Sequence, residues 1–383
     1  MLVADPETVL AILLLTVAVS VWLGRLPYFR SVGGALLAIL LGAVLANFGI
    51  IPTHDEMPSL YDPIFQQVTL AAIFLILLEV NLRAIKRAGA PMLIAFVLGA
   101  LGTMAGVLAA SALMPDARAM LGEHFTGAGA MLTGTYIGGS ANFNMLAIEY
   151  GVTKNPGLFT AMVVVDNVMS AAWILATIAI PPLLAKSRRF PPKAFAAEAA
   201  DPPPPPLEGI SAVAVPIAAA AVALALSRVI TNMSGGVVPV ILVLTTVALL
   251  AAQIPAVTRL SLSRPLGLFG LYLFLAAVGA SADLSTLLTY GALGAVLFGF
   301  IAIIFAVHAF VLFGAGAILR LDPDLVAIAS SANIGGATTA VALAEVRGRE
   351  DLLLPGLLAG TLGTATGTYA GFAIGSALGA LFA

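Results

Sequence analysis

Residues 133–144 read TGTYIGGSANFN, and residues 330–339 read SSANIGGATT. Each stretch interrupts an apolar segment with a pair of glycines and a group of small hydroxyl or amide side chains. Because a glycine weakens a helix by about 1 kcal/mol relative to alanine, both stretches predict a helix that stops and starts again. Backbone groups that are freed inside hydrocarbon need partners, so we expect both interruptions to lie within protein or to line a cavity.

The sequence around these stretches is typical of an all-α, polytopic membrane protein. Of the 383 residues, 61% are hydrophobic and 9% are charged, whereas a soluble domain carries about 25% charged residues. This composition excludes an ordinary soluble enzyme, a nucleic-acid-binding protein and a disordered chain. We therefore expect the lipid bilayer as a partner and a multi-pass location in the cell (inner) membrane. Segments long enough to span as helices lie at about 8–24, 32–51, 64–81, 91–114, 126–150, 157–184, 210–230, 237–252, 265–282, 291–319, 324–346 and 351–382.

The two halves of the chain resemble each other. A shift of 202 residues places Pro63 on Pro265, and a shift of 197 places the IGG triplet 137–139 on the IGG triplet 334–336. Internal repeats of this kind are common in secondary transporters. The charged, proline-rich stretch 185–209 predicts an extended linker between the halves.

Basic loops predict that the two repeats have opposite orientations in the membrane. In the first half, arginines and lysines gather in loops 25–31 and 82–90, whereas loop 52–63 is acidic. In the second half, the loop equivalent to 52–63 is loop 253–264, and this loop is basic. Because basic loops favour the inside of the membrane, the equivalent loops lie on opposite sides. Inverted repeats need an odd number of crossings per half, whereas the apolar segments supply six. Either one segment does not cross, or the linker lies on the side that its basic residues disfavour.

The interrupted segments are candidates for a solute site. A helix that restarts after a break presents a positive N-terminal end with unpaired N–H groups, which suits a carboxylate-like anion. The alternative is that these small residues only permit close helix packing. The candidate solute-binding residues are Thr135, Tyr136, Gly138, Gly139, Ser140, Asn142, Asn144, Gly335, Gly336, Thr338 and Thr339.

A carboxylate inside an apolar segment is a candidate for ion binding. Placing Asp166 at the centre of a membrane helix costs about 2.5–3.5 kcal/mol, so such a residue marks an ion or proton path by default. The alternative is a hydrogen-bond anchor between helices. Asp166 and Asn167, with the neutral ligands Asn333 and Thr364, would suit one Na⁺ or H⁺. No other cofactor or metal is expected. His308 is interpreted as a packed or interfacial imidazole, and the alternative is a proton relay.

Three stretches resemble a known family. TGTYIGGSANF (133–143), VVDNVMSAAW (164–173) and the region from SANIGGATTA to GTYAG (331–371) are similar to the DUF819 family of multi-pass membrane proteins. This family is grouped with the cation/proton antiporters and bile-acid symporters. The resemblance implies an inverted-repeat transporter fold, with a panel domain and a core domain that contains two broken, crossing helices. It also implies an elevator motion and a homodimer. The expected division is panel 1–89, core 90–184, linker 185–209, panel 210–290 and core 291–383.

Together these features predict a secondary active transporter, not an enzyme. The expected substrate is a small polar or anionic organic solute, and its transport is coupled to Na⁺ or H⁺. One alternative is an inorganic cation/proton antiporter with Asp166 as its sole carrier. Another is a non-transporting membrane receptor or assembly protein that has kept the fold.

Overall fold

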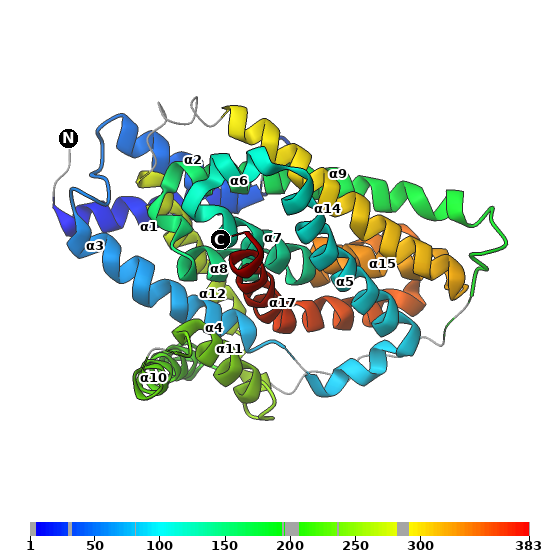
Figure 1. Cartoon of the computed structure of the whole chain (residues 1–383). Helices are drawn as coiled ribbons and strands as arrows, with labels where there is room; N and C mark the ends of the chain where they lie inside the picture. The colour runs from blue at the N-terminus through cyan, green and yellow to red at the C-terminus, as the bar shows by residue number, and fades with distance from the viewer. Residues whose placement is uncertain are drawn as a thin grey trace. The chain divides into compact units, whose positions relative to one another are not determined.

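The computed structural model is helical throughout the part that it describes, which is residues 5–29, 33–80, 82–193, 195, 207–235, 237–281 and 291–382 (Figure 1). Within these ranges, eight helices are long and apolar enough to cross a membrane. The expectation of an all-α membrane protein is therefore confirmed. The five consecutive prolines of the expected linker, residues 202–206, lie outside the described residues.

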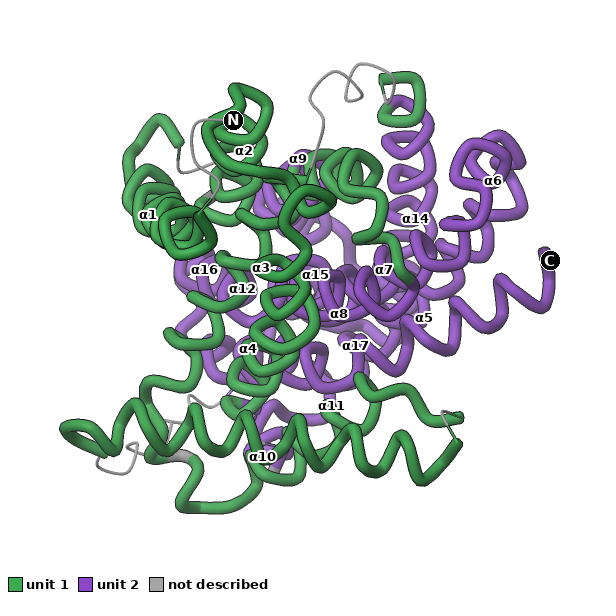
Figure 2. Tube along the Cα trace, turned by 90° about the vertical axis from the view of Figure 1, so that its left-hand side faces the viewer, with its two compact units in different colours: residues 1–79, 151–167, 204–294 green, residues 80–150, 168–203, 295–383 purple. Residues whose placement is uncertain are grey.

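The chain forms two compact units, each assembled from three separate stretches (Figure 2). Unit 1 comprises residues 1–79, 151–167 and 204–294, and unit 2 comprises residues 80–150, 168–203 and 295–383. Two long helices, α9 (Pro156–Leu184) and α14 (Gly291–Ile318), contribute residues to both units.

In unit 1, glycines allow neighbouring helices to approach each other closely, because a glycine has no side chain to keep them apart. A Cβ atom on Gly42 would collide with the carbonyl of Ala276, and one on Gly279 would collide with the carbonyl of Ile39. These contacts join α2 to α12 at backbone distance. The main helices of unit 1 are α1 (Pro6–Leu23), α2 (Gly33–Asn47), α3 (Pro58–Pro63), α4 (Thr69–Leu77), α10 (Ser211–Met233), α11 (Val240–Ala251) and α12 (Ser263–Ala280), with a π-helical turn over Ile64–Val68.

Unit 2 contains both of the glycine-interrupted stretches, and in each of them the chain turns back on itself. We define hairpin 1 as α7 (Phe125–Gly138) with α8 (Ser140–Glu149), and hairpin 2 as α15 (Pro323–Ile334) with α16 (Gly336–Val346). The other main helices of unit 2 are α5 (Ala90–Leu113), α6 (Pro115–Leu121) and α17 (Leu353–Phe382).

Side-chain contacts establish the return in both hairpins. In hairpin 1, a Cβ atom on Gly134 would collide with Leu146, which follows the break. In hairpin 2, the Arg347 guanidinium at the end of α16 lies 2.7 Å from the Asp324 carboxylate at the start of α15. Each second helix therefore runs beside the first. This geometry differs from the two crossing broken helices that the family resemblance implies, because a helix pair that returns does not continue across the bilayer.

Helix α17 is the common support of the two hairpins. Its 30 residues extend about 45 Å at 1.5 Å per residue, more than the roughly 30 Å of a bilayer's hydrocarbon core. Near its N-terminal end, Gly356 contacts Ile328 of hairpin 2. Near its C-terminal end, Gly375 contacts Tyr150, which directly follows hairpin 1. The two hairpins thus lie along opposite halves of α17.

Candidate functional site

The tip of hairpin 1 is a break at Gly139, and hydroxyl groups from neighbouring helices cap the carbonyls that it frees. Gly139 has a φ of +85°, a left-handed value that glycine adopts without steric cost. The last carbonyls of α7 lose their helical partners at this point. The Thr103 hydroxyl of α5 donates to the carbonyl of Tyr136 at 3.2 Å. The Thr364 hydroxyl of α17 lies 3.3 Å from the carbonyl of Gly138.

The tip of hairpin 2 is built in a similar way from its own residues. Gly336 has a φ of +80°, and the chain turns there between α15 and α16. The carbonyl of Ser331 accepts the backbone N–H of Gly335 at 2.8 Å and the hydroxyl of Thr339 at 3.0 Å. The end of α15 is therefore partly capped before α16 begins.

The N-terminal ends of α8 and α16 differ from these C-terminal ends because no side chain caps them. The N-cap residues are Gly139 and Gly335, and neither helix has a side-chain cap. The N-terminus of a helix carries the equivalent of about half a positive charge on its unpaired N–H groups. Each tip therefore combines a partly capped C-terminal end with a positive N-terminal end that no side chain of the described residues caps.

Both tips contact the same turn of α17. A Cβ atom on Gly360 would collide with the backbone N of Ala337, at the tip of hairpin 2. One on Gly363 would collide with the carbonyl of Ile137, at the tip of hairpin 1. Three residues of a helix span about 4.5 Å. The two positive helix ends are thus brought close together in the N-terminal half of α17, within the first eleven of its 30 residues.

Buried polar atoms surround this meeting point. The Thr368 hydroxyl donates to Oδ1 of Asn142 at 2.6 Å, and the Asn142 amide nitrogen lies beside Gly138 and Gly367. Burying a polar atom without a hydrogen bond is costly. Even so, four buried atoms near the tips have no hydrogen-bond partner among the described residues: Nδ2 of Asn142, Oδ1 of Asn144, Oγ of Ser331 and Oδ1 of Asn333.

The structure brings most of the predicted site residues together in unit 2. Ser140 and Thr338, in the first turns of α8 and α16, are exposed, whereas Asn142 and Asn333 are fully buried. The predicted residues in this unit are Thr135, Tyr136, Gly138, Gly139, Ser140, Asn142 and Asn144 in hairpin 1, Asn333, Gly335, Gly336, Thr338 and Thr339 in hairpin 2, and Thr364 in α17. Their binding roles stay predictions.

Asp166 and Asn167 belong to the part of α9 that lies in unit 1. Both side chains are half-buried, and the Asn167 amide donates to the carbonyl of Val163 at 2.8 Å within the helix. The Asp166 carboxylate therefore lies within an apolar membrane-length helix, as the sequence predicts. Its role as an ion ligand stays a prediction.

Sequence reasoning missed several residues that shape the tips. Thr103 is a hydroxyl residue on an uninterrupted helix, so no local signal marks it. The glycines of α17 could have been found, because Gly363, Gly367, Gly371 and Gly375 recur at every fourth residue. This spacing places them on one helix face, and that face receives hairpin 1.

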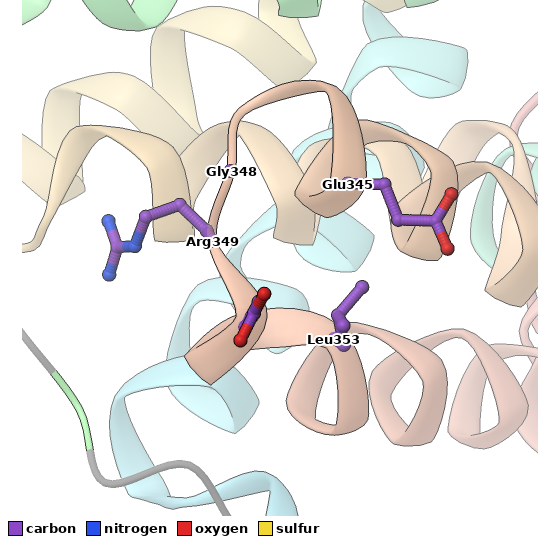
Figure 3. Close-up of a pocket in the computed structure, with 5 residues that line it drawn as sticks. Glu345, Gly348, Arg349 and Leu353 are labelled. Carbon is purple, nitrogen blue, oxygen red and sulfur yellow. The ribbon is translucent and has the colours of Figure 1, made fainter.

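A cavity of about 370 Å³ lies at the base of hairpin 2, away from the tips, and Glu345, Arg349 and Glu350 help to line it. Figure 3 shows the Arg349 side chain pointing away from Glu345. Its guanidinium lies 2.8 Å from the carboxylate of Asp351 and 2.9 Å from that of Asp322. The hydrogen bond with Asp351, together with the charge of Asp322, raises the pKa of Arg349 against the opposing effect of burial. Because this charge is already paired, the cavity is a poor anion site.

Comparison with known proteins assigns the chain to a family. A sequence model described as "Protein of unknown function (DUF819)" matches residues 11–381, which is nearly the whole chain. The chain belongs to the DUF819 family. Its relatives include "Uncharacterized membrane protein YjcL" of Bacillus subtilis (strain 168), which is 30% identical over 366 residues, 90% of this chain and 89% of the relative. The DUF819 resemblance of the three motif stretches is therefore confirmed, and the relative is likewise a membrane protein.

Proposed function

We propose that this protein is a secondary active transporter of a small organic solute that carries a carboxylate or a similar anionic group. The observation that carries the proposal is the contact of both hairpin tips with one turn of α17, at Gly360 and Gly363. Transporters commonly bind their substrates near the bilayer midplane, at the ends of interrupted helices. Hairpins that lie along opposite halves of a spanning helix would reach this point from opposite sides of the membrane.

The electrostatics of the tips support an anion over a bare cation. Hydroxyls and backbone N–H groups already bind carbonyls at the ends of α7 and α15, while no side chain caps the starts of α8 and α16. The fixed partial charge that remains is positive. The buried amide of Asn142 adds N–H donors that have no partner among the described residues.

Coupling to Na⁺ or H⁺ is the second part of the proposal, and it rests on Asp166. A carboxylate in the middle of a membrane-length helix is costly, and such a residue by default marks an ion or proton path. We assign Asp166 as the coupling group, with Asn167 beside it. The competing function, an inorganic cation/proton antiporter, would use the same carboxylate without an organic solute.

The returning hairpins also support an inverted-repeat architecture, for which we propose the elevator motion that the family resemblance implies. A hairpin that leaves on the side from which it entered does not count as a crossing. Five of the six apolar segments of each half then cross, if the shorter helices α2 and α11 cross together with the eight membrane-length helices. Five is the odd number that inversion requires. Under this proposal, the linker's basic residues lie on the side that the charge rule favours.

Transport in liposomes tests the proposal. Purified protein in proteoliposomes would be offered radiolabelled acetate, succinate, glutamate and alanine under an imposed Na⁺ or pH gradient. We expect gradient-dependent uptake of at least one carboxylate, and we expect Asp166→Asn to lower it at least tenfold. Glu123→Gln, which alters an exposed carboxylate next to hairpin 1, is the matched control and should transport normally.

Two other outcomes would contradict this function. Cation-driven proton flux without uptake of any organic solute would identify an antiporter. A folded protein that moves neither solutes nor protons would favour a receptor or assembly role.

A further inference from the structure

A chain of buried hydrogen bonds connects the two hairpins through His308 of α14. The Nε2 atom of His308 lies 2.9 Å from the Ser330 hydroxyl of hairpin 2. The Nδ1 atom lies 2.9 Å from the carbonyl of Gly99 and 3.0 Å from the Thr103 hydroxyl, both in α5. The Thr103 hydroxyl in turn donates to the carbonyl of Tyr136 in hairpin 1. His308, Thr103 and Ser330 are fully buried, and the whole chain of bonds lies within unit 2.

When the His308 imidazole is neutral, its partners fix the direction of every bond in this chain. The indole N–H of Trp173 can only donate, and it donates to the Ser330 hydroxyl at 2.9 Å. The carbonyl of Gly99 can only accept, so the Nδ1 atom of His308 carries a hydrogen. The Nε2 atom of a neutral imidazole then accepts the hydrogen of the Ser330 hydroxyl. Donation therefore runs in one direction, from Trp173 to hairpin 2, then to His308, and then through Thr103 to hairpin 1.

The imidazole is held closely by the helices around it. A Cβ atom on Gly99 would lie 3.0 Å from the Cε1 atom of His308, and one on Gly102 would lie 3.0 Å from its Cα atom. The Trp173 ring meets the His308 ring edge-on, with centroids 5.8 Å apart. A change in the position of His308 would therefore be transmitted to α5 and to hairpin 2.

The two ends of the chain show what it can do. An indole N–H at one end and a peptide carbonyl at the other neither release nor take up protons under physiological conditions. The residues that hydrogen-bond to His308 among the described residues are Gly99, Thr103 and Ser330, all uncharged. The chain of bonds is thus suited to holding elements in place and unsuited to conducting protons from one side to the other.

We propose that His308 is a positioning residue that couples the two hairpins, so that a change at one tip alters the other. Tyr136 lies three residues before Gly139, and Ser330 lies five residues before Gly335. The chain of bonds therefore contacts each hairpin close to its tip. The coupling serves the proposed transport function, in which both tips must respond to a bound solute. It is nevertheless a property of the folded chain and exists without solute.

Hydrogen–deuterium exchange of the solute-free protein in nanodiscs tests this coupling. Ser330→Ala cuts the chain of bonds at hairpin 2, and the readout is the exchange rate of backbone amides at 135–142, in the tip of hairpin 1. Thr103→Val removes the hydrogen bond to hairpin 1, and the readout is the exchange rate of backbone amides at 334–340, in the tip of hairpin 2. We expect each variant to raise exchange at the distant tip at least threefold. Ser330→Thr, which keeps the hydroxyl, should restore the native rate.

Ser111→Ala is the matched control, because Ser111 is a buried hydroxyl of the same helix, α5, that donates only to its own helix, at the carbonyl of Val107. It should leave both tips unchanged. Exchange that rises only in the mutated hairpin would overturn the proposal. If Ser330→Ala fails to fold, Thr103→Val decides the coupling through its readout at the tip of hairpin 2. Since the measurement uses no solute, it decides the coupling whether or not the protein transports.

Discussion

Gly360 and Gly363 lie three residues apart on α17, and each receives the tip of a different hairpin at backbone distance. Neither contact leaves space for a side chain. The two tips can meet at this turn of α17 only because residues 360 and 363 are glycines, which lack a Cβ atom. This relationship makes the glycines of α17 the most direct way to test the architecture of the site.

Gly363→Ala should destabilise the protein, whereas Gly379→Ala should not. The new Cβ atom at 363 would collide with the carbonyl of Ile137, and such overpacking costs about 1–3 kcal/mol. At 379 the nearest heavy atom, Cγ2 of Thr126, lies 3.9 Å away, so alanine gains up to about 1 kcal/mol of helix propensity. Thermal unfolding followed by intrinsic fluorescence would compare the two variants. Equal midpoints would mean that hairpin 1 does not rest on this face of α17.

Asn142→Asp should abolish transport without unfolding the protein. A carboxylate in the first turn of α8 would place a negative charge where we propose that the solute anion binds, while the helix end itself favours that charge. We expect uptake in proteoliposomes to fall at least tenfold. Thr366→Val, which removes an exposed hydroxyl that bonds only to its own helix, should transport normally. Unchanged uptake by Asn142→Asp would remove this residue from the solute site.

Arg349→Gln should loosen the base of hairpin 2. The guanidinium binds Asp322, whose side chain is fully buried, together with Asp324 and Asp351. Removing it leaves the buried carboxylate of Asp322 without its cationic partner, which we expect to cost about 3–5 kcal/mol of the free energy of unfolding. Arg118→Gln, which loses only a stacking contact with Phe382, should cost less than about 1 kcal/mol. Comparable losses in the two variants would show that the cluster contributes little.

Ionisation of Glu79 should slightly lower the free energy of unfolding as the pH rises through the range just above 4.5. Burial raises the pKa of Glu79 above its model-peptide value of 4.5, more than the ion pair with Arg264 lowers it. The folded state then binds the proton more readily than the unfolded state, so stability is greatest at low pH and declines as the carboxyl ionises. Because the side chain is nearly half exposed, the effect should be small. Unfolding midpoints of Glu79→Gln should lack this pH step.

The helical, membrane-spanning character of the chain was predictable because it depends on composition and segment length. The positions of both interruptions were predictable as well, since Gly139 and Gly336 adopt positive φ values that few other residues tolerate. The direction that the chain takes after each break was not predictable from the sequence. Local sequence shows that a helix ends, whereas the angle at which the next helix leaves depends on packing against α17.

The partners of the buried polar residues were equally beyond prediction. His308 appeared as a single imidazole in an apolar segment, yet it bonds to Thr103, 205 residues away in the sequence. Thr368 bonds to Asn142 across 226 residues. Such pairs leave no periodic or local pattern, because each is created by the packing of helices that meet only in the folded chain.

The sequence by itself determined that this protein is a bundle of membrane helices with two glycine breaks and a carboxylate, Asp166, inside an apolar segment. Those features follow from hydrophobicity and backbone freedom, which act over a few residues. Only the tertiary structure decided that both breaks are hairpin tips, that they meet at Gly360 and Gly363, and that His308 connects them. The physical reason is that close packing and buried hydrogen bonds join residues by distance in space, which the order of residues does not specify.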